Sequence, residues 1–402
     1  MGVSVLVLGT ITSREQSAFL LSHGVRPAPA DIVQEYLIKG LENDKRVNRV
    51  HAVCSPRIQS CVKNRILKIT DCQFEIARCE IESKGFLNFP GLGFIHREMK
   101  IVNSAKKWAK EQKDSNDALL VILYSMHSPF LRAASEIKRI VPNAVVAMIV
   151  PDLPQFMGKK NRIKALLKGI DKKRIESFLP IIDKYVLYTK HMAEYFGLSE
   201  DKWIVCEGLI DTDKINLCEK KLESNICVYA GSLLNKYAID VLVDAFEELP
   251  LDYSLHLYGD ASDAEILLKN RENYKKVKFK GLLPQKEIFE VMKQAKLLIN
   301  PRPSTLELAK YSCPSKTFEY MASGTPVLMT RLPGLPEEYY PYLFFFDDET
   351  KSGFRDKLIE VLSLSPYELR DKGRNAAEYL KKNKTSDIQV SKILDFCYEN
   401  RR

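Results

Sequence analysis

The feature that most constrains this sequence is a series of short apolar runs that alternate with segments of helical periodicity. Val3–Leu8 is apolar except for Ser4, and Ala118–Tyr124 and Asn143–Val150 have the same character. Such continuous runs suit parallel strands that are buried on both faces of a sheet. Helical periodicity appears between them, for example over His96–Gln112. The alternation predicts an α/β fold with a parallel sheet.

The same alternation is present in both halves of the chain, and its elements can be placed by residue number. The other strands expected in the first half are Arg49–Cys54, Ile66–Ile69, Phe74–Cys79 and Tyr185–Tyr188, and the other helices are Asp31–Leu41 and Leu131–Val141, whereas Thr10–Pro29 is polar and irregular. In the second half we expect strands at Ile226–Tyr229, Ser254–Tyr258, Lys276–Lys280, Lys296–Asn300, Thr325–Met329 and Leu343–Phe346. The helices expected there are Asp240–Glu248, Gln285–Gln294, Lys351–Leu364, Pro366–Lys382 and Ser386–Glu399.

The length of the chain points to more than one domain, because 402 residues exceed what one hydrophobic core usually holds. The segment Gly208–Asn225 is polar and lacks strong periodicity, so it is the expected linker. We therefore expect two Rossmann-like, doubly wound domains that face each other across a cleft. Their boundaries are 1–208 for the first domain, 209–224 for the linker and 225–385 for the second, with a helix at 386–402 that can pack back on the first domain.

Composition favours a cytoplasmic globular protein: 45% of the residues are hydrophobic and 28% are charged. No apolar stretch approaches the ~18–20 residues of a membrane span. Met1–Gly9 has no basic start, so it is expected to be a first strand and not a signal peptide. The nine cysteines are scattered without a CxxC pair or a Cys/His cluster, which makes a metal site built from them unlikely and suits reduced core residues.

The formal net charge is +9, and part of the excess is concentrated in one segment. Its basic residues, which only Asp171 opposes, are Lys159, Lys160, Arg162, Lys164, Lys168, Lys172, Lys173 and Arg174. An amphipathic basic helix over 159–174 could lie on an anionic membrane surface, which would make the protein peripheral on the inner face. The alternative is an ordinary solvated helix. No nucleic-acid motif accompanies the charge.

The stretch from Asn300 to Val327 predicts a strand, a long polar loop and a short helix. Ser315 is a suitable N-cap for this helix and Gly324 a suitable stop. The helix N-terminus presents free N–H groups and the positive end of the helix dipole, so it suits an anion such as a diphosphate. Lys316 in the first turn has the charge that an anion bound there would need. A solvated lysine on an ordinary helix is the alternative interpretation.

No standard nucleotide-binding or hydrolase motif is present. The sequence has no GxxxxGK[ST], no GxGxxG after Val3–Leu8 and no GxSxG, which disfavours P-loop enzymes, dehydrogenases and serine hydrolases.

The second half resembles the retaining glycosyltransferases of family 4, which have the two-domain GT-B fold. Four segments carry the resemblance in matching order and spacing: YAGSLLNKYAIDVLVDAF (229–246), LHLYGD (255–260), VKFKGLLPQKEIFEVMKQAKLLINP (277–301) and PSKTFEYMASGTPVLMT (314–330). The resemblance implies transfer of a sugar from a nucleotide-diphospho-sugar to a saccharide or lipid-linked saccharide, commonly in surface-polysaccharide assembly. It implies no cofactor and no required metal.

The resemblance also implies donor-binding residues. Glu319 matches a glutamate that binds the ribose hydroxyls, and a carboxylate is a suitable acceptor for a vicinal diol. Gly231 and Ser232 match a turn that approaches the diphosphate, and Gly259 and Leu282 follow neighbouring strands. Cations are needed because negative charge builds up on the leaving diphosphate. The residues available for this are Lys236, Lys316 and Arg302.

The chain departs from the family pattern at the first glutamate of the donor-site pair. The matching position, eight residues before Glu319, is Tyr311, and Glu307 is four residues earlier. Whether Glu307 takes over the missing contact to the donor sugar is open at this point. The YS-x-PSK loop is similar to a variant form within the family.

In the first half, His127 follows the strand Ala118–Tyr124, where the family often has a histidine near the donor sugar, and Asp152 follows Asn143–Val150. Either could assist the acceptor hydroxyl, although a histidine at a strand end can be purely structural. The resemblance implies front-face attack with retention, in which the diphosphate accepts the acceptor's proton. Two other classes stay open: a non-catalytic GT-B protein, favoured by Tyr311, and a nucleic-acid-binding protein, favoured by charge alone.

Overall fold

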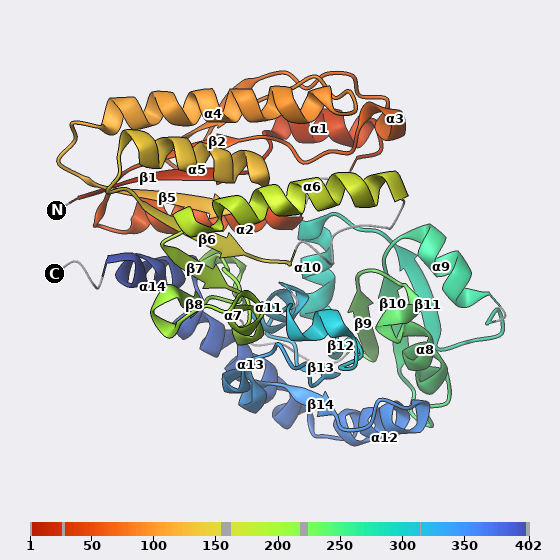
Figure 1. Cartoon of the computed structure of the whole chain (residues 1–402). Coiled ribbons are helices and arrows are strands. Elements are labelled where there is room, and N and C mark those ends of the chain that lie inside the picture. The colour runs from red at the N-terminus through yellow and green to blue at the C-terminus, as the bar shows by residue number, and fades with distance from the viewer. Residues whose placement is uncertain are drawn as a thin grey trace. The chain divides into compact units, whose positions relative to one another are not determined.

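A computed structural model describes residues 2–25, 29–153, 162–217, 224–269, 271–313 and 315–398, with the backbone alone for 29, 162–168 and 315. The chain forms two compact units (Figure 1). The first consists of Met1–Leu209 together with Ser386–Arg402, and the second of Ile210–Thr385.

The described part of the first unit contains one eight-stranded sheet in the order β3-β4-β2-β1-β5-β6-β7-β8. Every neighbouring pair is parallel except β3 and β4, which form an antiparallel edge. The strands are β1 (Val3–Gly9), β2 (Val47–Cys54), β3 (Cys72–Ile76), β4 (Cys79–Ser83), β5 (Ala118–Tyr124), β6 (Val145–Val150), β7 (Lys184–Leu187) and β8 (Trp203–Val205).

Helices cover both faces of this sheet, which explains why its central strands are apolar throughout (Figure 1). All seven residues of β1 are buried. Val5 and Val7 pack in one core with α2 and α14, whereas α4 and α5 pack against each other on the opposite face. The helices are α1 (Arg14–Ser22), α2 (Pro29–Asn43), α3 (Cys61–Asn64), α4 (Leu92–Gln112), α5 (Ser128–Ile140), α6 (Arg162–Phe178), α7 (Lys190–Phe196) and α14 (Ser386–Tyr398), with 3-10 turns η2 (Leu179–Ile181) and η3 (Glu200–Lys202).

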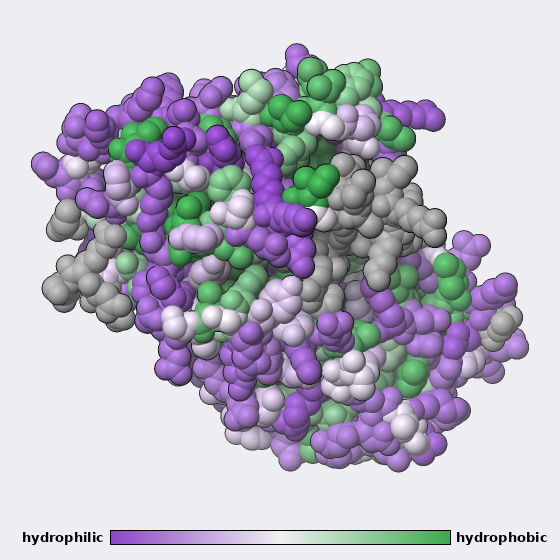
Figure 2. All heavy atoms as spheres, in the orientation of Figure 1, coloured by the Kyte–Doolittle hydropathy of each residue, from purple (hydrophilic) through white to green (hydrophobic). Residues whose placement is uncertain are grey.

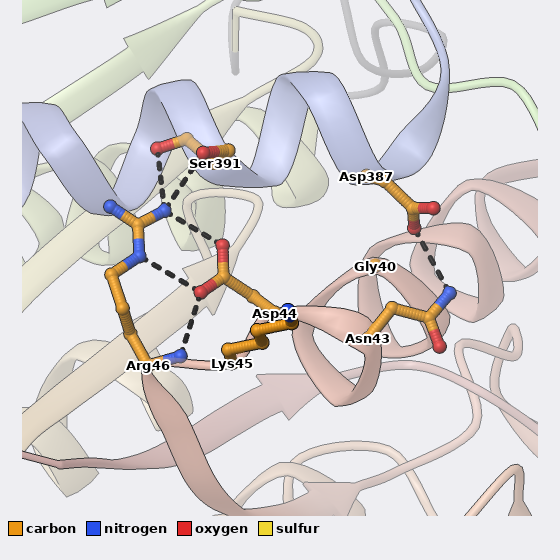
Figure 3. A pocket seen from close by; sticks show the side chains of 7 residues that line it. All are labelled: Gly40, Asn43, Asp44, Lys45, Arg46, Asp387 and Ser391. Atoms are coloured by element: carbon orange, nitrogen blue, oxygen red, sulfur yellow. Dashed lines mark hydrogen bonds and ion pairs between the residues drawn. The ribbon is translucent and has the colours of Figure 1, made fainter.

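The C-terminal helix α14 lies against α2 and is held there by polar contacts (Figure 3). The Arg46 guanidinium donates to both carboxylate oxygens of Asp44, at 2.8 and 2.7 Å, and to Ser391 Oγ at 2.9 Å, and it pairs with Asp395. Gly40 allows the close approach, because a Cβ there would lie 2.8 Å from the carbonyl oxygen of Ser386. The pocket in Figure 3 is therefore lined by residues that join α2 and α14 at the amino end of β2.

The second unit contains a six-stranded, fully parallel sheet in the order β11-β10-β9-β12-β13-β14, as far as the chain is described. Its strands are β9 (Ile226–Ala230), β10 (Ser254–Tyr258), β11 (Val277–Gly281), β12 (Leu297–Asn300), β13 (Val327–Thr330) and β14 (Phe344–Phe346). Its helices are α8 (Ile239–Glu247), α9 (Ala261–Leu268), α10 (Gln285–Gln294), α11 (Ser315–Ala322), α12 (Lys351–Leu362) and α13 (Pro366–Asn383), with 3-10 turns η4 (Thr212–Lys214), η5 (Asn235–Tyr237), η6 (Glu307–Lys310) and η7 (Glu337–Tyr342).

The predicted α/β class with parallel sheets is confirmed, and several local expectations are wrong. Thr10–Pro29 was expected to be irregular, yet it contains α1, which a capping box between Ser13 and Gln16 starts. Ile66–Ile69 is not a strand: Ile66 and Ile69 instead fill a small core with Leu20. The single strand expected at Phe74–Cys79 is instead a hairpin: β3 ends at Ile76, the chain turns at Ala77, whose φ is +54°, and β4 begins at Cys79. Short elements with weak periodicity, namely α3, α7, α9 and β8, were not predicted.

Candidate functional site

The candidate site is built at the carboxyl edge of the second unit's sheet. Because the strands are parallel, the segments that leave β9, β10, β11 and β12 all emerge on this edge, where ligands of doubly wound sheets bind. Their first residues are Gly231, Gly259, Leu282 and Pro301. Two buried polar atoms at or near this edge, Asn300 Nδ2 and Thr330 Oγ1, have no hydrogen-bond partner within the described chain.

Gly231 brings the backbone of this edge into direct contact with a lysine. Its φ is +155°, and a Cβ at this position would collide with Lys316 Nζ. The Gly231 N–H donates to the carbonyl oxygen of Tyr258 at 2.8 Å, and its own carbonyl oxygen leaves no room for a Cβ at Gly259. The turn therefore requires glycine at both positions, and it places the ammonium of Lys316 against main chain that a ligand can also approach.

Tyr320 fixes helix α11 to the end of β9. Its side chain is fully buried, and its hydroxyl lies 2.9 Å from the Ala230 backbone nitrogen and 3.3 Å from the Ala230 carbonyl oxygen. Because Lys316 and Glu319 are on the same helix, this contact sets their position relative to Gly231. Sequence reasoning missed Tyr320, since an aromatic residue beside Glu319 gives no signal of a polar contact so far away in the chain.

Lys316 and Glu319 form a partly buried pair of opposite charges on successive turns of α11. The pKa of Lys316 is lowered from 10.5 to about 8, mainly by burial; the charge of Glu319 acts against this shift, and the charge of Arg302 contributes to it. Burial raises the pKa of Glu319, and Lys316, a hydrogen bond from Gln285 and the charge of Lys214 act against that rise. Burial thus disfavours the charged form of both side chains, and a ligand that compensates these charges would gain binding free energy.

Two more predicted cations lie around the ring of Tyr237. Lys236 Nζ is 4.9 Å and Arg302 Cζ 5.7 Å from the ring centroid. Lys236 is exposed in η5, whereas Arg302 is partly buried and close enough to Lys316 to affect its pKa. Lys316 in turn lies 5.1 Å from the ring centroid of Tyr229. The structure therefore gathers Lys316, Arg302 and Lys236 on aromatic rings beside Gly231, with a positive excess over Glu319.

The remaining predicted donor residues are less closely joined to this cluster. Ser232 Oγ lies 3.5 Å from Asp263 Oδ2, and Leu282 is 58% exposed after β11. Glu307 is exposed at the start of η6, and Tyr311, which is partly buried, ends that turn. The backbone of α11 begins at Ser315, but the side chain of Ser315, and so its capping role, lies outside the described part.

In the first unit, His127 lies at the start of α5, directly beyond β5. Its Nε2 is buried without a hydrogen-bond partner among the described residues, and its ring packs edge-on against Phe130 with 5.6 Å between the ring centroids. The pKa of His127 is lowered from 6.5 to about 3, mainly by burial and further by repulsion from Arg97 and Arg57. The imidazole is therefore neutral at pH 7 and can donate or accept one hydrogen bond.

Asp152 lies beyond the end of β6 and is exposed. It is close enough to Tyr124 and Tyr188 to raise the pKa of both hydroxyls, although burial is the main cause there. His127 and Asp152 thus share the carboxyl edge of the first unit's sheet, as the strand positions predict.

Of the basic stretch 159–174, only part is described. Lys159 and Lys160 lie outside the described residues, as do the side chains of Arg162, Lys164 and Lys168. Helix α6 does form from Arg162 onward. Lys172 pairs with Glu176 at 3.7 Å and Arg174 with Glu98 at 2.5 Å, while Lys173 is exposed.

Among the described residues, no cluster of three or more His, Cys, Asp or Glu side chains is arranged to hold a metal ion. Within the same residues, none of the helices has both the length and the apolar character that a membrane span needs.

Comparison with protein families gives one match: residues 224–363 fit the family described as "Glycosyl transferases group 1". This segment contains all the donor-side residues discussed above. A comparison with curated protein sequences gives no significant match.

Solved structures similar to the whole chain share its fold at low sequence identity. HepE from Anabaena, crystallised with UDP, has a TM-score of 0.64 at 12% identity, over 98% of this chain and 100% of its own. The lipopolysaccharide outer core galactosyltransferase WaaB has a TM-score of 0.63 at 14% identity, over 99% of both chains. Sucrose-phosphate synthase from Thermosynechococcus elongatus has a TM-score of 0.63 at 13% identity, over 100% of this chain and 99% of its own.

Proposed function

We propose that this chain, a group 1 glycosyltransferase of the GT-B fold, moves a sugar with retained anomeric configuration from a nucleotide-diphospho-sugar to a hydroxyl of a saccharide or lipid-linked saccharide. One observation carries the proposal: Lys316 is held against Gly231, with Glu319 one helical turn further along α11. Surface-polysaccharide assembly is the process that we assign to it.

The diphosphate is assigned to the turn at Gly231. The amino end of α11 and the ammonium of Lys316 are both attractive to an anion there, and Arg302 adds a second positive charge. Departure of the nucleoside diphosphate concentrates negative charge on the β-phosphate, and cations fixed before the reaction stabilise that charge without reorganisation. We assign this role to Lys316 and Arg302, with Lys236 as the exposed contributor.

The ribose is assigned to Glu319. Its carboxylate can accept hydrogen bonds from both hydroxyls of a vicinal diol, which would compensate the cost of its burial. Structures of HepE, which shares the fold, contain UDP and UDP-glucose, and this supports a nucleoside diphosphate as the class of ligand.

The transfer itself needs no nucleophile from the chain in this proposal. The acceptor hydroxyl attacks the anomeric carbon on the face from which the diphosphate departs, and a diphosphate oxygen takes the hydroxyl proton. The anomeric C–O bond breaks as the new one forms, so configuration is retained. His127, neutral at pH 7, is assigned a hydrogen bond to the donor sugar, and Asp152 to the acceptor hydroxyl.

A lipid-linked acceptor would require a position at the cytoplasmic face of a membrane. We assign this to the basic stretch 159–174, of which Lys173 is an exposed, described member. The resemblance of fold to a lipopolysaccharide galactosyltransferase is compatible with such an acceptor.

A second candidate is a non-catalytic protein that binds nucleotide sugars, and Tyr311 favours it, because the resemblance places a sugar-contacting glutamate at that position. Glu307 is exposed and shows no ion pair with another described residue, which also supports this second candidate. Turnover of a donor separates the two candidates.

Donor binding tests the proposal directly. Isothermal titration of wild type with UDP, GDP and ADP should give binding by one of them, and CMP, which has no diphosphate, should bind weakly or not at all. Glu319→Gln should weaken that binding at least tenfold, or by more than about 1.4 kcal/mol. Glu287→Gln, an exposed glutamate on α10, is the matched control and should bind as wild type does. Equal binding by both variants would refute the assignment of Glu319.

A further inference from the structure

Exposed apolar side chains of this chain are concentrated in one part of the first unit. Of the seventeen large hydrophobic side chains that are exposed in the described chain, ten fall between residues 19 and 99. We call these ten the apolar patch: Phe19, Leu21, Val62, Leu67, Leu87, Phe89, Leu92, Phe94, Ile95 and Met99. Single exposed apolar residues need no explanation, but such a concentration marks an interaction surface.

Backbone hydrogen bonds show that much of the patch is one surface. Asn88 joins the segment before α4 to the start of α3 and to the segment after α3, because its N–H donates to the carbonyl oxygen of Leu67 at 2.8 Å and its own carbonyl oxygen accepts from the N–H of Cys61 at 3.0 Å. Beneath these segments Phe86, Ile66 and Leu20 share a small core, so Phe19 and Leu21 of α1 flank the same core. Figure 2 shows hydrophobic side chains gathered where Figure 1 places α3 and the start of α4.

The start of α4 offers the patch's most exposed helical face. Leu92, Ile95 and Met99 are spaced i, i+3 and i+7, so they lie along one side of the helix, and they are 64%, 57% and 57% exposed. The chain leaves this row outside its own core although Ile101, Ala105 and Trp108 of the same helix are buried.

Positive charge without an acidic partner lies within the patch. Ser55–Thr70 contains no aspartate or glutamate. In this segment Lys63, Arg65 and Lys68 are exposed, and none of the three forms an ion pair with another described residue. The basic helix α6 adjoins the patch as well, because the Arg174 guanidinium lies 5.4 Å from the ring centroid of Phe94.

From this combination we propose that the apolar patch inserts into the interface of an anionic lipid bilayer. Apolar side chains interspersed with cations suit the headgroup region of such a bilayer. The apolar side chains enter the boundary of the acyl chains, and the cations contact the lipid phosphates. A second copy of the chain fits less well, since a symmetric dimer would bring the same cations of both copies together across the interface.

The position of the patch also gives membrane binding a role in glycosyl transfer, and this role rests on the proposed function. Its segments follow the carboxyl ends of β2 and β4, which is the edge that also carries His127 at the end of β5. Insertion of the patch would bring this edge of the sheet to the membrane surface. A lipid-linked acceptor could then reach the site while its lipid stays in the bilayer.

Vesicle co-sedimentation tests the proposal on the full chain. Wild type should bind vesicles of phosphatidylcholine with about one-third phosphatidylglycerol, and bind vesicles of phosphatidylcholine alone at least about tenfold more weakly. The triple variant Leu92→Ser/Ile95→Ser/Met99→Ser should lose about tenfold or more of the binding to the anionic vesicles. Lys63→Gln/Arg65→Gln/Lys68→Gln should lose the preference for anionic lipid.

Tyr195→Ser/Ile266→Ser/Tyr367→Ser removes three large side chains outside the patch that are 42%, 68% and 69% exposed, and it should bind vesicles as wild type does. Unchanged thermal unfolding and nucleotide binding show that the Leu92 triple variant is folded and that its donor site is intact. Absence of wild-type binding to vesicles, equal binding by the Leu92 triple variant, or a wild-type dimer that this variant converts to a monomer would each overturn the proposal. If wild type binds no nucleotide, the proposed function is refuted instead.

Discussion

Replacement of Lys316 by methionine separates the effect of this lysine on folding stability from its contribution to donor binding. The side chain keeps its unbranched shape and most of its length, and it loses its charge. Because the pKa of the ammonium is depressed from 10.5 to about 8, mainly by burial, its protonated form carries an unfavourable free energy on the order of 3 kcal/mol in the folded protein. Lys316 also lowers the pKa of Glu319, and the methionine variant gives up that benefit.

The net expectation is a variant at pH 7 that is as stable as wild type or more stable, by up to ~2 kcal/mol. Below pH 8 the lysine is protonated in both the folded and unfolded states, so wild type bears the full cost. Between pH 8 and 10.5 the folded protein releases the proton first, so the stability of wild type rises with pH and the difference from the variant shrinks. Binding of the nucleoside diphosphate should fall 10- to 100-fold, since a hydrogen bond to a charged group contributes about 1.5–3 kcal/mol.

Urea unfolding at pH 7 and pH 9.5 measures the difference in stability between wild type and Lys316→Met, and isothermal titration measures the loss of nucleotide affinity. Lys278→Met, an exposed lysine on β11, is the control and should change neither. A Lys316→Met protein that is destabilised at pH 7 by more than about 1 kcal/mol and still binds the nucleotide as wild type does would refute the reasoning.

Three further predictions concern the support of the site, its pH dependence and the C-terminal helix. Tyr320→Phe removes the hydroxyl that contacts Ala230 N–H and should cost about 1–3 kcal/mol of unfolding free energy in urea, while a value below 0.5 kcal/mol would show that the contact is not made. In the free enzyme kcat/KM should fall as pH rises above about 8, because Lys316 loses its charge there, and the fall should move to higher pH in Lys316→Arg; an unchanged profile in that variant would assign the decline to another group. Arg46→Met should speed amide exchange in α14 selectively, because the contacts to Ser391 and Asp395 are lost, and equal exchange in both proteins would contradict this role.

Elements whose pattern is strong were predictable from sequence. The apolar run Ala118–Tyr124 matches β5 residue for residue, and the short helix expected after Ser315 is present as α11, which begins one residue earlier than expected, at Ser315. Gly324 ends this helix with φ +73°, as its type suggested. In these cases local chemistry and tertiary packing favour the same conformation.

Features that depend on contacts between distant segments could not be predicted. The position of Lys316 against Gly231 joins residues 85 positions apart, and the Tyr320 hydroxyl reaches Ala230 across 90. The apolar patch was missed for the same reason: nothing in the run Gly85–Met99 says which of its apolar residues face inward. Phe86 is buried in a core that also contains Leu20, while Phe94 remains exposed.

The roles assigned to the site residues follow from the resemblance and from the chemistry of the Lys316–Glu319 cluster, so they depend on turnover of a donor. The most direct measurement follows, by ¹H NMR, the first sugar released from the nucleotide sugar whose nucleotide binds best. The account predicts slow release of that sugar in its original anomeric configuration, before mutarotation, and release at least about tenfold slower by Glu319→Gln at donor concentrations below saturation. Release of the opposite anomer would contradict retention, and no turnover of any UDP-, GDP- or ADP-sugar, with or without saccharide acceptors, would contradict the assignment of a donor site.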